Sequence, residues 1–305
     1  MCIRDRFKTL LNRELQEHKW GFLYLPWLIS IFMSSLILLV WLGLTDVVAG
    51  EITFSTKIYE NPEIVEGMRN ATIDQRMGVI KAGLLVLGLP VVLGLGLSIL
   101  SFAVSTFFDE RKDKSVVFWR SMPVSDTTTV LSKLVFIIFF APLLILPPIL
   151  LVHFVALFAA SVYFANNEIV PFIWAWEAYP LLDWFRIVIS LWVQGLWTLP
   201  LISWLMLSSV WSRRPIAISF VPIVVIIAAE NAAFSSNSTF EFILERIRAW
   251  RASSVFEEEA SFQVAPLVDI PVLIFSPQFI LGLFISGLLI ALTISLRGKY
   301  GRTLD

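Results

Sequence analysis

The chain has 305 residues, of which 57% are hydrophobic and 15% charged, against roughly 25% charged in an average soluble domain. Its formal net charge of −1 gives no sign of a nucleic-acid partner, and its single cysteine, Cys2, excludes an internal disulfide and a cysteine-rich metal site. With a mean hydropathy of +0.81, this composition predicts a polytopic integral membrane protein. Its spans must be helices, because open strands would leave backbone groups unpaired in lipid. We therefore expect an all-α fold forming one membrane domain over residues 1–305.

The first predicted element is an amphipathic helix over residues 7–20. At helical spacing, its apolar side chains gather near one side and its charges lie elsewhere. The apolar side chains are Phe7, Leu10, Leu11, Leu15 and Trp20. The segment is too short and too polar to span a bilayer, so we expect it to lie along the inner membrane surface.

Six later segments are long and apolar enough to cross a hydrocarbon core, which takes about 20 residues of helix. They run over residues 24–45, 82–108, 134–164, 184–210, 216–234 and 271–296. The second contains Gly83, Gly88, Gly94 and Gly96, which permit close helix approach. In the third, prolines at 142, 147 and 148 remove backbone donors, which predicts a kink.

Basic residues predict the orientation of these spans. The N-terminus, the loop at 109–133, the turn at 211–215 and the C-terminal tail together hold 15 of the 23 Lys and Arg residues. Basic residues favour the cytoplasmic side, so we expect both termini there. The 235–270 loop then lies outside. Within it, Phe240, Ile243, Leu244, Ile247 and Trp250 predict an amphipathic helix on the outer leaflet.

Sequence signatures of catalysis are missing. There is no GxxxxGK[ST] phosphate loop, no GxSxG and no HExxH, and the two histidines, His18 and His153, are too far apart to suggest a zinc site. We therefore expect a chain that is not an enzyme and holds no metal. The intramembrane polar candidates are His153 in the third span and Glu230 near the outer end of the fifth. For both, a structural role is favoured over a functional one.

The segment 109–126, DERKDKSVVFWRSMPVSD, is a dense polar and aromatic island between two apolar runs. Helical spacing over 114–122 predicts a short transverse helix that Pro123 ends, with Ser125 or Asp126 placed to cap the next helix. A competing interpretation is a solvated loop anchored at the interface by Phe118 and Trp119. That interpretation leaves the charge pattern and the helix punctuation unexplained.

This island resembles the loop between the second and third membrane helices of bacterial permease subunits of the ABC type-2 transporter family. The match is local but specific, and the number and placing of the spans extend it across the chain. The matching positions are Glu110, Arg111, Lys112, Ser115, Phe118, Trp119, Arg120, Ser121, Pro123, Val124, Ser125 and Asp126.

The resemblance implies a permease of an ATP-driven exporter that works by alternating access. Its expected partners are two separate ABC ATPase subunits, which would carry the ATP and Mg, a second permease copy or paralogue, and the lipid bilayer of the bacterial inner (plasma) membrane. The segment 109–126 would be the coupling loop. Basic residues of the loop, including Lys114, could pair with acids on the ATPase, and Phe118 and Trp119 could fill its groove.

Two alternatives come from other classes. A membrane-embedded enzyme of lipid or cell-wall metabolism would need acids, histidines or a nucleophile gathered at one membrane depth, and the sequence offers only scattered ones. An ion-coupled secondary transporter would need more buried charge than this chain shows, and no inverted repeat is visible. The substrate is open under each interpretation.

Overall fold

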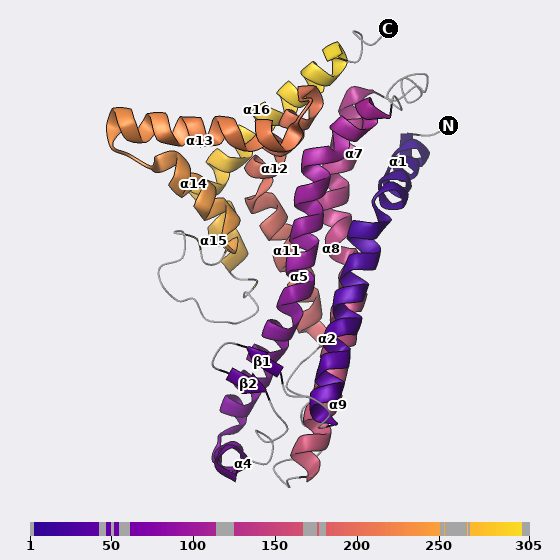
Figure 1. Cartoon of the computed structure of the whole chain (residues 1–305), viewed down its shortest axis with the longest axis vertical. Coiled ribbons are helices and arrows are strands. Elements are labelled where there is room, and N and C mark those ends of the chain that lie inside the picture. The colour runs from indigo at the N-terminus through magenta and orange to yellow at the C-terminus, as the bar shows by residue number, and fades with distance from the viewer. Residues whose placement is uncertain are drawn as a thin grey trace.

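Figure 1 shows the computed structural model, which describes residues 3–42, 47–49, 52–54, 62–113, 125–166, 176, 181–250, 253, 267 and 269–300. Helices make up most of these residues. The described exception is a short antiparallel pair, β1 (Val47–Ala49) and β2 (Ile52–Phe54), which lies between the first two predicted spans. The fold thus fits the predicted helical membrane protein.

Within the described residues, five helical segments are long and apolar enough to cross a membrane. They are formed by η1 (Trp20–Tyr24) with α2 (Leu25–Trp41), by α5 (Ile73–Lys112), by the run from α7 to α9, by α13 (Pro215–Phe234) and by α16 (Pro277–Tyr300). The predicted fourth span is instead a pair, α11 (Leu181–Trp197) and α12 (Leu199–Trp211), bent by 58°. The count of six spans holds only if this pair is one broken span.

The third span is interrupted where its prolines predict a kink. It consists of α7 (Asp126–Val135), the π-helical turn η2 (Phe136–Phe140), α8 (Ala141–Leu144) and α9 (Leu146–Asn166). Proline lacks the amide hydrogen that would donate to the carbonyl four residues earlier in the helix. Prolines and π-turns are both common where a helix departs from regular α geometry. The interruptions lie beside Pro142 and Pro147, two of the prolines for which the sequence predicted a kink.

The shorter helices are α1 (Ile3–Glu17), α4 (Pro62–Asn70), α14 (Ser238–Ile247) and α15 (Asp269–Ile274). Residues 271–296 were expected to be one span, but α16 begins only at Pro277. Ser276 precedes it, and the Ser276 hydroxyl accepts from Phe279 N at 3.2 Å. A serine cap followed by proline is a strong start signal, which explains the break after α15.

The start of α5 is earlier than residue 82, where the apolar run begins. Thr72 and Gln75 form a reciprocal capping box: Thr72 Oγ1 accepts from Gln75 N at 3.3 Å, and Gln75 Oε1 accepts from Thr72 N at 2.9 Å. The helix therefore extends nine residues upstream of the predicted span. Polarity marks where a membrane helix enters lipid, and the cap marks where it starts.

The packed helices enclose one main core. α2 lies against α5 and α9, and α12 lies against α5 and α16. At Gly94, an added Cβ would come within 2.6 Å of Ile29 Cδ1, so this glycine allows α2 and α5 to approach. The rings of Phe22, Phe102 and Phe136 meet inside the core, with centroids 5.1–5.9 Å apart.

One apolar helix projects from this bundle. Figure 1 shows α13 running across the view, away from α2 and α9. Most of its large apolar side chains are exposed, including Phe220, Val224 and Phe234, and Ser219 is its buried residue. Such a surface is expected of a helix that faces lipid or another membrane protein.

Candidate functional site

Glu110, the second residue of the coupling loop, is buried at the end of α5. Its carboxylate meets three cations: Arg13 Nη2 at 2.6 Å, Lys133 Nζ at 3.1 Å and Arg297 Nη2 at 3.3 Å. These cations come from α1, α7 and α16. The carboxylate therefore faces the interior of the bundle, and its ion pairs are with residues of this chain.

Lys133 is fully buried, and its ammonium group contacts three side chains. Its Nζ lies 2.8 and 3.0 Å from the Glu14 carboxylate oxygens, 2.8 Å from Thr106 Oγ1 and 3.1 Å from Glu110. Glu14 is also fully buried and contacts Arg13 at 3.1 Å. Burying a charge costs free energy unless the charge is paired. The contacts of Lys133 and Glu14 offset that cost.

Asp126 completes the set. Its carboxylate accepts from Arg297 Nη1, which joins the first residue of α7 to the last turn of α16. We call the six side chains the ion-pair network, and their three positive and three negative charges balance. The network consists of Arg13, Glu14, Glu110, Asp126, Lys133 and Arg297.

Arg111 makes a different kind of link. Its Nη2 donates to Ser209 O at 2.9 Å and to Ser212 O at 2.6 Å, both at the C-terminal end of α12. The last carbonyls of a helix lack backbone partners, and arginine is a good cap for them. Arg111 thereby fixes the end of α5 to the turn that leads into α13.

Both ends of the coupling loop are therefore attached to the bundle. Residues 109–113 end α5, and Ser125 caps α7, its Oγ accepting from Thr128 N at 3.1 Å, as the sequence predicted. Lys112 is exposed. The expected transverse helix and its contact residues lie outside the described residues, and their role in docking an ATPase stays a prediction; these residues are Lys114, Ser115, Phe118, Trp119, Arg120 and Pro123.

His153 is buried between helices and satisfied on both nitrogens. Its Nε2 lies 3.0 Å from Leu84 O, while its Nδ1 accepts from Trp184 Nε1 at 3.2 Å. These partners define a neutral ring with the proton on Nε2. An added Cβ on Gly88 would lie 3.2 Å from that nitrogen, so the glycine gives the ring its space. The arrangement matches the structural role favoured for His153.

Glu230 caps a neighbouring helix. Its carboxylate accepts from Ser238 N at 2.8 Å, from Thr239 N at 3.0 Å and from Ser236 Oγ at 3.0 Å. Ser238 and Thr239 begin α14, whose first amides lack partners within the helix. A carboxylate there also interacts well with the helix dipole, so the contacts match the structural role favoured for Glu230.

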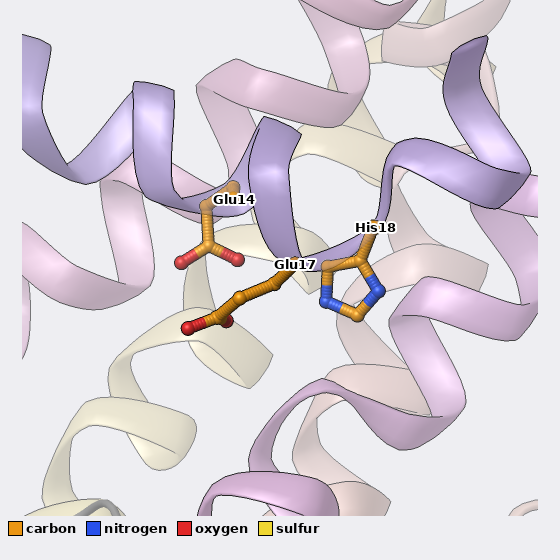
Figure 2. Close-up of side chains that lie close together, drawn as sticks. All are labelled: Glu14, Glu17 and His18. Carbon is orange, nitrogen blue, oxygen red and sulfur yellow. The ribbon is translucent and has the colours of Figure 1, made fainter.

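Two carboxylates of α1, one of them from the ion-pair network, lie near the histidine that follows this helix. Figure 2 shows Glu14, Glu17 and His18 together, and one donor atom from each lies within 4.8 Å of the others. Burial raises the pKa of Glu17 and lowers the pKa of His18. The carboxylates already contact Lys133 and Arg13, which supply the positive charge that a metal ion would bring.

Sequence reasoning missed four members of the ion-pair network: Arg13, Glu14, Lys133 and Arg297. Their signal was weak. Arg13 and Glu14 belong to the polar side of a predicted surface helix, and Lys133 directly precedes an apolar run. Charges at such boundaries usually extend to the membrane interface, so nothing in the sequence marks these as buried.

Comparison with known proteins gives no relative. No family model matches the chain, and neither a curated protein nor a solved structure is similar to it. The functional argument therefore depends on the loop motif and on the geometry of the site.

Proposed function

We propose that this chain is the membrane-spanning permease subunit of an ATP-driven bacterial exporter of the ABC type-2 kind. Separate ATPase subunits would bind ATP and Mg and act on the coupling loop at the cytoplasmic side of the inner membrane. The substrate would cross by alternating access between inward and outward states. This proposal extends the resemblance in residues 109–126.

The observation that carries the proposal is the ion-pair network at the two ends of this loop. Glu110 precedes the loop centre and Asp126 follows it, and both are bound to Arg297 of α16. Glu110 is also bound to Arg13 of α1 and Lys133 of α7. A force on the loop would therefore reach four helices through short contacts, which a freely solvated loop could not provide.

The exposed α13 supports a second permease copy or paralogue as a partner. Its apolar surface needs lipid or protein around it, and Arg111 connects its entry turn to the loop. Movement of the loop would thus be felt at the helix that faces the neighbour.

The polar candidates inside the membrane do not favour the alternatives. His153 and Glu230 each have their own partners, on α5 and α11 for the first and on α14 for the second. A proton relay or an active site would instead require such groups to face one another or a substrate.

The test is co-purification with the cognate ATPase, using Trp119→Ala and Arg120→Glu variants. We expect both variants to recover less ATPase and to give lower ATP turnover than the unmodified complex. Lys299→Glu is the matched control, because it reverses an exposed positive charge outside the loop. Undiminished complex and unchanged ATP turnover in both loop variants would overturn the coupling assignment.

A further inference from the structure

The bend between α11 and α12 leaves a backbone carbonyl without its usual helical partner. Pro200 has no amide hydrogen, and Leu201 N donates to Thr198 O at 3.0 Å instead of to the carbonyl four residues back. That carbonyl belongs to Trp197, the last residue of α11. Inside a membrane protein such a group needs a donor from elsewhere.

Arg246 of α14 supplies this donor. Its Nη1 donates to Trp197 O at 3.2 Å, and its Nη2 donates to Gln278 O in the first turn of α16. The guanidinium lies over the Trp197 ring, 3.9 Å from the centroid, and Trp197 Nε1 donates in return to Glu245 O at 2.9 Å. One side chain thus joins three helices at the bend.

The surroundings are shaped around this side chain. A Cβ added to Gly282 of α16 would lie 2.7 Å from Arg246 Nη2 and 2.9 Å from Cζ, so any larger residue there would displace the guanidinium. Gln194 reinforces the contact from α11, since its Oε1 accepts from Trp250 N at 2.8 Å. Trp250 itself packs with Leu273 and Phe279.

Burial of the Arg246 guanidinium is not explained by stability alone. Arg246 is 2% exposed, and its described acceptors are carbonyls rather than a carboxylate. Burial lowers the pKa of Arg246 to about 10, so the side chain is still charged at neutral pH. An apolar residue would fill the space at lower desolvation cost, which makes a buried, carbonyl-bound cation a candidate for a functional role.

We propose that Arg246 is a clamp that sets the angle between α11 and α12 by holding the end of α11 against the first turn of α16. Release of the guanidinium would free Trp197 O and let the two halves of the broken span change their angle. The inference depends on the geometry of α14 and the bend, and it holds whether or not an ATPase drives the protein.

The test measures the bend directly, with spin labels at Phe185 of α11 and Trp211 of α12, both exposed. Cys2 is the single cysteine and is first replaced by serine. In lipid nanodiscs, we expect one narrow distance for the parent and a shifted or broadened distribution for Arg246→Gln. A second label pair at Leu93 and Leu288, on α5 and α16, should stay unchanged.

Two matched pairs of variants complete the design. Arg248→Gln removes the same charge from an exposed position two residues away and should leave the bend unchanged. Gly282→Ala keeps Arg246 but removes its space and should disturb the bend, while Gly287→Ala, with nothing within 4 Å of its added Cβ, should not. If Arg246→Gln fails to fold, Gly282→Ala decides. A parent-like distance in the folded variants at 246 and 282 would overturn the proposal.

Discussion

At the scale of single residues, the charges of the ion-pair network are paired inside the protein. Lys133 and Glu14 are 119 residues apart in the sequence, yet both are buried and in contact. Replacing a whole buried ion pair by apolar residues is often neutral, whereas removing one partner leaves an uncompensated charge and costs about 3–5 kcal/mol. The value of this pair therefore lies in fixing which helices meet.

This reasoning predicts strong coupling between Glu14 and Lys133. Glu14→Gln and Lys133→Met should each lower the free energy of unfolding by about 3 kcal/mol, and the double variant should lose clearly less than their sum. Denaturant unfolding in detergent measures the cycle. Lys112→Met is the control, because Lys112 is exposed. Additive losses would show that the two side chains act independently.

Glu230 gives a second prediction at this scale. Glu230→Ala removes the acceptor for Ser238 N and Thr239 N, so the first turn of α14 should open more often. Hydrogen exchange of a peptide covering residues 236–247 should become faster. Glu241→Ala, an exposed acid in the same turn, should have little effect; equal exchange in both variants would remove Glu230 from its capping role.

At the scale of elements, the sequence predicted which segments form apolar helices. It predicted less well where these helices begin, where they bend and which of their faces is buried. Long apolar runs correspond to α2, α5, α13 and α16 because lipid requires such runs. The break at Trp197 was missed, since a single proline is tolerated in many membrane helices. The capping box at Thr72 and the cap at Ser276 are visible in the sequence. They were missed because the span boundaries were predicted from hydropathy alone.

The amphipathic helices show a second limit. The helix expected from Phe240 to Trp250 corresponds to α14, which ends at Ile247; its buried residue is Arg246, while Phe240 and Ile247 are exposed. In α1, Leu11 and Leu15 pack against the core and Leu10 is buried, as their spacing allows. Periodicity shows that a helix has two faces, but tertiary neighbours decide which face is covered.

Arg111 carries the prediction at this scale. Arg111→Gln should loosen the end of α12, because the carbonyls of Ser209 and Ser212 lose their donor. We expect faster hydrogen exchange over residues 208–214, and Lys112→Gln, at the next and exposed position, should leave it unchanged. Identical exchange in the two variants would argue against a link between the loop and the entry to α13.

At the scale of the whole molecule, one end of the bundle combines the two described ends of the coupling loop with α1 and the C-terminal end of α16. Figure 1 shows α1, the start of α7 and the C-terminal end of α16 at this end, where the ion-pair network connects them. The sequence predicted this grouping from its basic residues. It could not predict the network, since pairing between distant charges depends on the packed fold.

The most direct test of ATP-driven coupling is a distance across this end in the presence of the partner ATPase. Spin labels at Trp20 and Trp211, both exposed, would be measured in proteoliposomes with and without ATP, on the Cys2→Ser background. We predict that ATP shifts the distance in the parent, and that Lys133→Met retains the ATPase but loses the shift. No ATP-dependent change in a parent complex that holds its ATPase would contradict the account.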